Sequence, residues 1–229
     1  MTRQAIELPY VFIVATTFFP NELRAATFAD ACASWNKHLK YDGQVGLIIS
    51  DDGSAVIPLG ITSFKDMRPR HTYQFRHGVG ASLNAGFKLA FETTPVVLYA
   101  VDDWALVEDF DITPWVYALV TRNDIGMVRL GPPHPKTRGS VEAVSVLWQG
   151  WALRLDRVAF AFGHRPALYH KRMIDAYGWF EEDVNAYECE QFYNENFCSS
   201  TGPDIIQALP HPWQHIESIE LADVDPKKG

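Results

Sequence analysis

Short apolar runs alternate with amphipathic stretches over the first hundred residues of the chain. This alternation is typical of parallel strands that crossover helices bury on both faces. The first apolar run is Val11–Ala15, and Gly46–Ser50 and Val96–Val101 follow it as further strands. The pattern therefore predicts a central parallel sheet in this part of the chain.

Two amphipathic helices are predicted between these strands. Asn21 is a suitable N-cap for the first helix, and His77–Gly80 opens the second. Apolar side chains recur in both at the spacing of one helix face, which predicts that each packs on the sheet. These side chains are Phe28, Cys32, Trp35 and Leu39 in the first helix and Leu83, Phe87 and Phe91 in the second.

The alternation weakens in the second half of the chain, which predicts a mixed or antiparallel sheet there. Ile125–Leu130 and Val141–Leu147 have the apolar content of strands, and helices are expected over Arg172–Ala176 and Glu188–Phe197. The polar residues 222–229 are expected to form a frayed tail. The predicted fold class is α/β: a single domain over 1–221 with a mixed, mainly parallel central sheet flanked by helices.

Composition narrows the class of protein further. A chain of 229 residues with 47% hydrophobic residues can bury a substantial core in one domain. The formal net charge of -8 gives no general attraction to nucleic acid or anionic lipid, so neither partner is favoured. The apolar runs are shorter than the roughly 20 residues of a membrane span. Three cysteines without zinc spacing are expected to be reduced thiols in a cytoplasmic protein.

Two acidic pairs follow two of the predicted strands. Asp51 and Asp52 open an Asp-Asp-Gly-Ser turn, and Asp102 and Asp103 end a later strand. Ligands of open α/β sheets collect beyond the carboxyl ends of the strands, so both pairs are expected to face one crevice. Carboxylates of the first pair can accept hydrogen bonds from a uracil imide or from ribose hydroxyls. Those of the second pair suit magnesium or manganese.

Each acidic pair also has an ordinary structural explanation. Asp-Gly turns are common, and two adjacent acids can form a solvated turn. Trp104–Leu106 follows the second pair directly, however, so these acids lie in apolar sequence, where like charges need a cation or a pKa shift. This favours the metal interpretation. The glycines of Gly78–Gly86 lack the order and position of a dinucleotide-binding fingerprint.

Four segments of the first half follow one another in a recognisable order. They are Ala15–Phe18, Asp51–Ser54, Gly78–Gly86 and Tyr99–Asp103. This order resembles the family 2 glycosyltransferases of the GT-A fold. Members of that family carry Pro-Thr-Tyr-Asn, Asp-Asp-Gly-Ser, Asn-x-Gly-x-x-x-Ala-Arg-Asn-x-Gly and Asp-x-Asp in the same order. The resemblance extends over Val11–Ser218, nearly the whole chain.

One departure from the family pattern concerns the metal. Ala100 replaces the first acid of Asp-x-Asp, so the resemblance leaves metal binding to Asp102 and Asp103. The remaining positions stay in register with the family motifs. They are Thr16, Asp51–Ser54, Gly80, Asn84 and Gly86.

The second half carries three weaker similarities to the same family. Tyr177–Glu182 resembles the segment that shapes the acceptor side, and His215 resembles the histidine of a closing His-x-Gly-x-Ser motif. A lone histidine in such sequence is as often structural. Tyr187–Glu190 resembles Glu-Asp-x-Asp, whose second residue is the catalytic base. The resemblance makes Glu188 the base, and Glu190 remains the alternative because glutamate replaces the aspartate.

The resemblance implies a role for each matched residue and a division of the chain into a nucleotide-binding half (1–103) and an acceptor-binding half (104–221). The nucleotide ligands would be Thr16, Asp51, Asp52, Ser54, Gly80, Asn84 and Asp102; the ligands of Mn or Mg would be Asp103 and His215. The acceptor side would contain Trp179, Glu181 and Glu182, and the catalytic carboxylates would be Glu188 and Glu190.

The implied reaction is an inverting transfer of a sugar from a nucleotide-diphosphate sugar, with a UDP-sugar favoured, to a hydroxyl of a soluble acceptor. A sugar-phosphate nucleotidylyltransferase would need a glycine-rich, basic loop near the first strand, and Thr16–Leu23 has neither glycine nor lysine. Two alternatives remain open: a catalytically inactive nucleotide-sugar-binding protein, and a transferase that modifies a DNA base. The second would use Lys136, Arg138, Lys171 and Arg172 as phosphate contacts.

Overall fold

The computed structural model of the chain describes residues 7–55, 61–133, 135–143, 151–157, 161–209 and 212–216. The strands are β1 (Val11–Thr17), β2 (Leu39–Lys40), β3 (Val45–Asp51), β4 (Arg70–Tyr73), β5 (Val96–Val101), β6 (Trp104–Leu106), β7 (Phe110–Asp111), β8 (Ile125–Arg129), β9 (Gly139–Ala143), β10 (Trp151–Leu155), β11 (Ala167–His170), β12 (Asp204–Leu209) and β13 (Trp213–His215). The helices are α1 (Glu22–His38), α2 (Gly78–Phe91), α3 (Thr113–Thr121), α4 (Arg172–Tyr177) and α5 (Ala186–Ser199).

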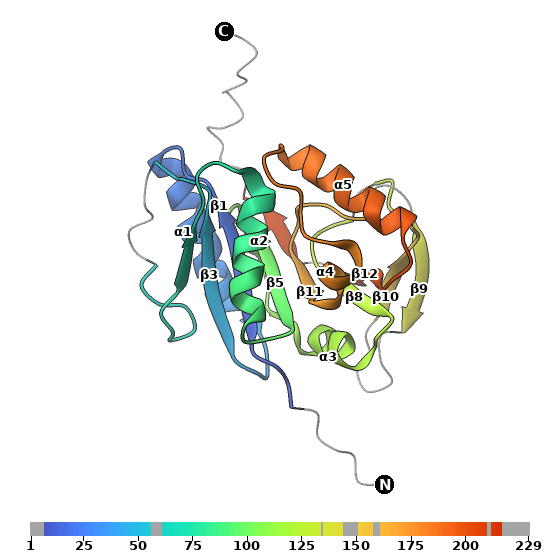
Figure 1. The fold of residues 1–229 in the computed structure, drawn as a ribbon. Coiled ribbons are helices and arrows are strands. Elements are labelled where there is room, and N and C mark those ends of the chain that lie inside the picture. The colour runs from blue at the N-terminus through green and yellow to red at the C-terminus, as the bar shows by residue number, and fades with distance from the viewer. Residues whose placement is uncertain are drawn as a thin grey trace.

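One nine-stranded sheet organises the molecule, in the order β4-β3-β1-β5-β11-β8-β12-β10-β9 (Figure 1). β4, β3, β1 and β5 are parallel neighbours, and β8 pairs in parallel with β12. β11 is antiparallel to both β5 and β8, and β10 is antiparallel to β12 and β9. Within this sheet only β11 and β10 therefore oppose the direction of β1. The predicted α/β class with a mixed, mainly parallel sheet is confirmed.

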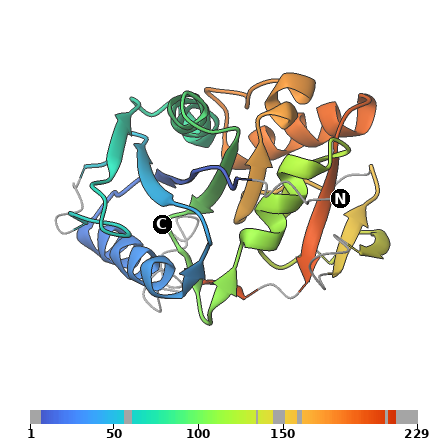
Figure 2. The ribbon, with the colours of Figure 1, turned by 90° about the horizontal axis from the view of Figure 1, so that it is seen from below.

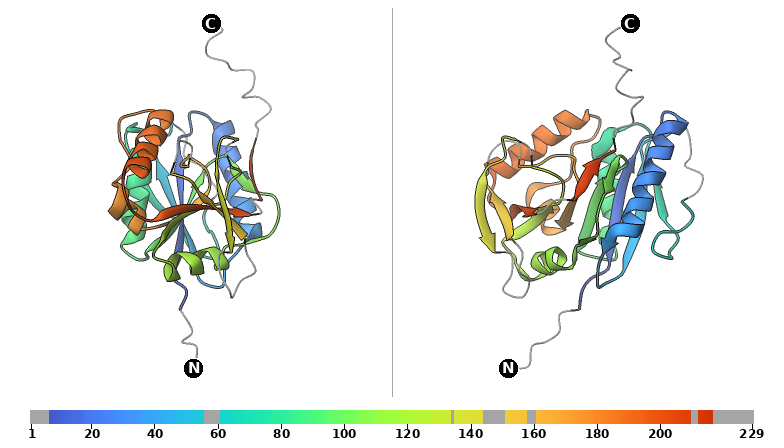
Figure 3. Two further views of the ribbon diagram at one scale, coloured as in Figure 1. Left: turned by 90° about the vertical axis from the view of Figure 1, so that its right-hand side faces the viewer. Right: turned by 180° about the vertical axis from the view of Figure 1, so that it is seen from behind.

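Helices cover both faces of the sheet, and the alternation along β1 shows how. Val11 and Ile13 face the core cluster that contains residues of α1 and α3. Phe12 and Val14 face the cluster that contains residues of α2, α4 and α5. Figure 2 shows α1 and α2 on opposite sides of the sheet, and the rear view in Figure 3 shows α1 over the face that α2 does not cover. Burial on both faces explains why these strands are continuous apolar runs.

Both helices predicted in the first half are confirmed, α1 with its predicted side-chain cap and α2 without one. Asn21 caps α1, because its Oδ1 accepts a hydrogen bond from the backbone N–H of Arg24 at 3.0 Å. Phe28 and Trp35 of α1 are fully buried. Leu39, predicted on the same face, is also buried but lies just past the helix in β2. α2 begins at Gly78, as the glycine-containing segment predicted.

The two predicted halves of the chain share the central sheet. β11, from the second half, pairs with β5, from the first, through partners such as Leu168 and Leu98. The division into a nucleotide-binding and an acceptor-binding half stays a prediction. Of the strand predicted over Val141–Leu147, the structure describes residues up to Ala143, which belong to β9; the rest and the tail 222–229 lie outside the described residues.

The sequence predicted reduced cysteines and no membrane-spanning segment. Cys32, Cys189 and Cys198 are all free thiols. In the part of the chain that the structure describes, none of the helices has both the length and the apolarity needed to span a membrane. The cytoplasmic location stays a prediction.

Candidate functional site

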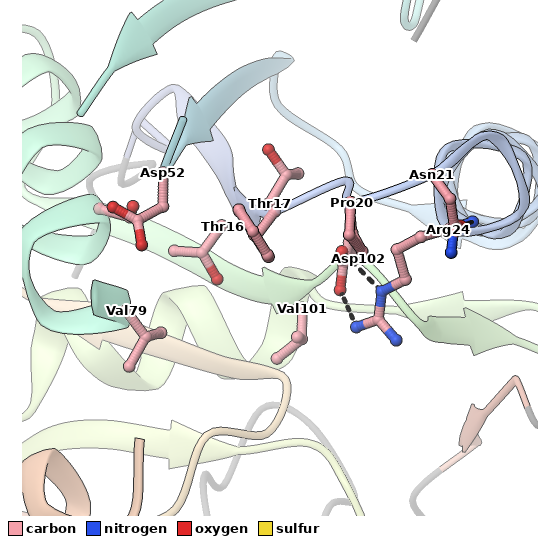
Figure 4. Close-up of a pocket in the computed structure, with 11 residues that line it drawn as sticks. Thr16, Thr17, Pro20, Asn21, Arg24, Asp52, Val79, Val101 and Asp102 are labelled. Atoms are coloured by element: carbon pink, nitrogen blue, oxygen red, sulfur yellow. Dashed lines mark hydrogen bonds and ion pairs between the residues drawn. The ribbon is translucent and has the colours of Figure 1, made fainter. Parts of the chain in front are cut away.

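A pocket lies at the carboxyl edge of the parallel strands β1, β3 and β5. Thr17 pairs with Asp51 and Thr16 with Val101, so the three strands end at the same level. The pocket has a volume of about 340 Å³, within the roughly 300–1,000 Å³ usual for small-molecule sites. Its lining consists of Thr16, Thr17, Phe18, Pro20, Asn21, Arg24, Asp52, Val79, Ser82, Val101 and Asp102 (Figure 4).

Each predicted acidic pair contributes one residue to this pocket. Asp52 lies on one side of it, and Asp102 with Arg24 lies on the other, with Thr16 between them (Figure 4). Asp103 is not part of the lining, and it reaches the pocket only through its bond to Arg24. The expected crevice therefore exists, and Asp52 and Asp102 are the acids that face it.

Asp51 and Ser54 close the turn that presents Asp52. Oδ1 of the buried Asp51 accepts from the backbone N–H groups of Gly53 at 2.9 Å and Ser54 at 2.8 Å. Its Oδ2 accepts from the hydroxyls of Thr17 and Ser54. Gly53 has a φ of 81°, a conformation that favours glycine. The carboxylate predicted to bind a nucleotide at Asp51 is thus fully used within the turn.

Asp52 is held against the N-terminus of α2. Its carboxylate accepts from the backbone N–H groups of His77 at 2.9 Å and Gly78 at 3.1 Å. Burial raises the pKa of Asp52, and these two backbone bonds work against that rise. The positive end of the helix also favours the ionised form. The carboxylate is therefore fixed in direction and still open to the pocket.

Asp102 and Asp103 share one guanidinium. Arg24 donates through Nε to Asp102 Oδ2 at 3.0 Å and through Nη2 to Asp102 Oδ1 at 2.5 Å. The same Nη2 donates to Asp103 Oδ2 at 2.8 Å. Burial raises the pKa of Asp102, and the bonds to Arg24 oppose this. Two buried like charges, which the sequence indicated would need a cation, are held together by Arg24.

The atoms predicted to bind a metal ion suit its chemistry, although Arg24 already binds three of the four carboxylate oxygens of Asp102 and Asp103. Nε2 of His215 lies 2.9 Å from Asp103 Oδ2, and Asp103 Oδ1 is buried without a hydrogen-bond partner. Carboxylate oxygens and an imidazole nitrogen suit Mn²⁺ or Mg²⁺. Among the described residues, however, no three acidic, histidine or cysteine side chains are gathered closely enough to hold an ion. An ion would need oxygens that now bind Arg24.

Gly80 and Asn84, predicted to contact the nucleotide, dock a distant segment on α2. A Cβ at Gly80 would collide with the carbonyl oxygen of Glu181. The side chain of Asn84 donates to Phe180 O at 2.9 Å and to Glu182 Oε1 at 2.7 Å, and it accepts from Phe180 N at 3.0 Å. Neither residue lines the pocket. The glycine and the amide serve close packing of two chain segments.

Trp179 of the predicted acceptor side lies along the last turn of α2. Its half-exposed ring has the ammonium of Lys88 5.1 Å from its centroid. Lys88 is ten residues after Gly78, which corresponds to about 15 Å along a helix axis. Trp179 therefore packs beside the end of α2 that is far from Asp52. The side chain of Glu181 is exposed, and that of Glu182 is bound by Asn84.

The two catalytic candidates lie in the first turns of α5 and have different partners. Glu188 is exposed and forms a capping box, in which its Oε2 accepts from Asn185 N at 3.2 Å and its own N–H donates to Asn185 Oδ1 at 3.0 Å. Glu190 is half-buried, and its Oε1 accepts from His164 N at 2.6 Å. The structure thus separates a solvent-facing carboxylate from one bound to the backbone.

The start of α5 lies beside the start of α2. Asp183 N donates to His77 O at 2.8 Å, and a Cβ at Gly78 would contact the carbonyl oxygen of Val184. His77 and Gly78 are the residues whose N–H groups hold Asp52. The segment that leads into Glu188 is therefore next to the Asp52 side of the pocket.

No protein-family model and no curated protein sequence matches the chain. Its structure, however, is similar to several solved ones. The structure of residues 1–349 of S. aureus TarS matches with a TM-score of 0.57 and 13% identity over 87% of this chain and 60% of that one. GalNAc-T7 with UDP, GalNAc and Mn²⁺ matches with a TM-score of 0.60 and 11% identity over 92% and 44%.

A third solved structure is also similar to this one. The mannosyltransferase PcManGT from Pyrobaculum calidifontis, in complex with GDP-Man and Mn²⁺, matches with a TM-score of 0.54 and 16% identity over 88% of this chain and 57% of that one. The chain has a GT-A glycosyltransferase fold. It spans about three fifths or less of the length of these three structures. The similarity does not single out family 2.

Three lining residues with chemistry that could serve a ligand were not among the predicted site residues: Arg24, Ser82 and Phe18. Arg24 is the third residue of α1, and a cation in the first turn opposes the helix dipole, which was a signal that it serves another group. Ser82 lines the pocket with a buried hydroxyl that has no hydrogen-bond partner. Phe18 lines the pocket with its aromatic ring, and the guanidinium of Arg76 lies over this ring, 5.5 Å from the ring centroid. Phe18 and Ser82 lie within the matched segments Ala15–Phe18 and Gly78–Gly86, but neither is one of the residues in register with a family motif.

The basic residues considered for a DNA acceptor do not form part of this pocket. Arg172 donates from Nη1 to the carbonyl oxygens of Arg122 at 2.5 Å and Ile125 at 2.8 Å. It therefore ties α4 to the C-cap of α3 and to the first residue of β8. These contacts of Arg172 do not favour the DNA-modifying alternative.

Proposed function

We propose that the protein transfers a sugar from a nucleotide-diphosphate sugar to an acceptor hydroxyl, with the pocket between Asp52 and Asp102 as its donor site. The observation that carries this proposal is the position of the pocket, at the carboxyl edge of β1, β3 and β5 in a GT-A fold. Ligands of open α/β sheets bind at this edge. The neighbours bind UDP, UDP-GlcNAc or GDP-Man, and we propose a UDP-sugar as the donor.

The Asp52 side of the pocket would hold the nucleoside. A carboxylate fixed by two backbone N–H groups is ready to accept a further hydrogen bond from a base imide or a ribose hydroxyl. The unpartnered hydroxyl of Ser82 and the hydroxyl of Thr16 lie in the same lining. The exposed ring of Phe18 offers a flat apolar surface for a base.

The reaction would be a single displacement with inversion at the anomeric carbon. The acceptor oxygen forms a bond to that carbon as the bond to the diphosphate oxygen breaks, and the leaving group keeps the bonding electrons. Glu188, exposed at the start of α5, would take the acceptor proton. Glu190, whose carboxylate binds His164 N, is the alternative base. A positioned general base contributes about 10²- to 10⁴-fold to the rate.

A divalent cation, Mn²⁺ or Mg²⁺, would be held by Asp102, Asp103 and His215. Bound there, it would neutralise charge that develops on the leaving diphosphate. The carboxylates of Asp102 and Asp103 and the imidazole of His215 would supply its ligand atoms. One of these atoms, Asp103 Oδ1, has no hydrogen-bond partner in the structure.

The proposal is tested by thermal unfolding of the protein with UDP- and GDP-sugars, with and without Mn²⁺. A ligand that binds only the folded state at about a hundred times its Kd adds about 2.7 kcal/mol to stability. Each donor that binds is then incubated with acceptor sugars and labelled-sugar transfer is measured. Binding without turnover would favour the inactive binding protein, and no binding of any nucleotide sugar would contradict a donor site.

A further inference from the structure

The proposed donor pocket is acidic, although its proposed ligand is an anion. The charged side chains that line it are Arg24, Asp52 and Asp102, and Asp103 adds a further carboxylate beside Arg24. Asp102 and Asp103 side chains are only 3% and 9% exposed, so solvent screens them weakly. A diphosphate entering this pocket therefore needs more positive charge than the arrangement supplies, because Arg24 is already shared by two carboxylates.

The contacts of Arg24 resemble those of a bound cation. It reaches both oxygens of Asp102 and one oxygen of Asp103, and it leaves only Asp103 Oδ1 without a partner. The same two carboxylates are the proposed ligands of a divalent ion. Arg24 and the ion would therefore compete for the same oxygens.

Arg24 is accessible from the pocket as well as bound to the two carboxylates. Its side chain is 25% exposed, comes from the first turn of α1 and lines the cavity. A guanidinium binds phosphate oxygens in the same two-pronged geometry in which it binds a carboxylate. A diphosphate beside Asp102 would therefore offer the guanidinium of Arg24 oxygens that it can bind in place of the carboxylates.

We propose that Arg24 is a resident counter-ion that a divalent cation displaces from Asp102 and Asp103, and that the displaced guanidinium then binds the diphosphate of the donor. This inference rests on the proposed function. The cation alone binds weakly, because it must break the bonds of Arg24. The cation and a nucleoside diphosphate bind cooperatively, because the diphosphate gives Arg24 a new partner. Such coupling between two ligands typically amounts to about 5- to 150-fold in affinity.

The test is titration of Mn²⁺ into the full chain, with free Mn²⁺ followed by electron paramagnetic resonance. Without nucleotide, Arg24→Gln is expected to bind Mn²⁺ about tenfold or more tightly than the wild type, because the carboxylates lose their internal cation. With UDP present, the wild type is expected to gain affinity for Mn²⁺ within the range of about 5- to 150-fold, and Arg24→Gln to gain much less. GDP in place of UDP shows whether the base matters.

Arg76→Gln is the matched control, since Arg76 stacks on Phe18 at the same pocket without bonding either carboxylate in the contacts described above. It is expected to bind Mn²⁺ as the wild type does. Equal or weaker Mn²⁺ affinity of Arg24→Gln without nucleotide would overturn the inference. So would an equal gain with UDP in both proteins.

A second variant covers the case in which Arg24→Gln does not fold, which circular dichroism melting would reveal. Arg24→Lys keeps the charge but not the two-pronged contact, so its affinity for Mn²⁺ alone is expected to lie above that of the wild type. An affinity no higher than that of the wild type would contradict the inference. The Mn²⁺ titration without nucleotide is independent of sugar transfer. If the Arg24 variants bind Mn²⁺ more tightly but the protein transfers no sugar, the proposed function is contradicted and the inference about Arg24 is not.

Discussion

The side-chain amide of Asn84 pairs with the backbone of Phe180 as a neighbouring strand would. Its Nδ2 donates to Phe180 O at 2.9 Å and its Oδ1 accepts from Phe180 N at 3.0 Å. Asn84 is 2% exposed in the middle of α2, and Phe180 packs in the same core cluster as α2 and α5. One side chain thus binds both backbone groups of Phe180 and helps to hold the segment that leads into α5 and its two catalytic candidates.

Asn84→Ala is expected to destabilise the protein by about 2–4 kcal/mol, because it leaves the buried N–H and C=O of Phe180 without partners. Urea denaturation measures this loss. Asn36→Ala is the control, since Asn36 is exposed and its Oδ1 accepts one backbone bond from Lys65 at 3.0 Å. The control is expected to lose less than about 1 kcal/mol. Equal losses in both variants would show that the Asn84 contacts do not stabilise the segment.

Asp52→Asn is expected to weaken UDP binding by about 10- to 100-fold, since hydrogen bonds to charged groups contribute about 1.5–3 kcal/mol. The amide oxygen of asparagine can still accept from Gly78 N, so the fold is expected to be retained. The ligand-induced shift in thermal unfolding measures the affinity. Asp183→Asn is the control, because Asp183 is exposed and binds His77 outside the pocket. Undiminished UDP binding by Asp52→Asn would exclude this carboxylate from the donor site.

The buried strands could be predicted because burial on both faces leaves an unmistakable apolar run. Val96–Val101 is a strand over the predicted residues, and β1 begins at Val11 as expected. The N-cap at Asn21 was equally predictable, since it depends on local chemistry. Short elements were not. β11 has four residues and is held by its two neighbours in the sheet, and its sequence has no pattern long enough to detect.

The candidate site was only half predictable, because a motif specifies a local conformation and leaves open what comes close to it. Gly80 was predicted as a nucleotide ligand, but the group that lies against it is the carbonyl of Glu181, about a hundred residues away. Asp51 and Asp52 are adjacent in one motif, yet one closes a turn and the other faces the pocket. Arg24 belongs to no motif. Its place in the first turn of a helix indicated that it binds another group, but only the tertiary structure shows that this group is the pair Asp102 and Asp103.

His164 is expected to make the stability of the protein depend on pH. Burial lowers its pKa from 6.5 to about 4. Between pH 6.5 and 4 the unfolded chain therefore binds a proton at His164 more readily than the folded chain does. The contribution of neutral His164 to stability is fully present above about pH 6.5 and is lost as the pH falls towards 4. From about pH 7.5 to about pH 5 this one group is expected to account for roughly 2 kcal/mol of lost stability.

Urea denaturation of His164→Gln at both pH values isolates that contribution. The variant is expected to lose about 2 kcal/mol less than the wild type over the same window, because glutamine does not titrate. His71→Gln, at an exposed position of β4, is expected to keep the wild-type dependence. A His164→Gln curve parallel to that of the wild type would mean that His164 accepts its proton equally in the folded and unfolded chain.

Glu188→Gln and Glu190→Gln separate the two candidates for the base. Glutamine can serve at the third position of a capping box, so Glu188→Gln is expected to keep the bond to Asn185 and the stability of α5 while losing its basicity. If Glu188 takes the acceptor proton, its variant should lose about 10²- to 10⁴-fold in kcat with UDP-sugar binding retained. Glu190→Gln, which can still accept from His164 N, should then retain kcat within about tenfold. The reverse result would make Glu190 the base, and two fully active variants would exclude both carboxylates from the proton transfer.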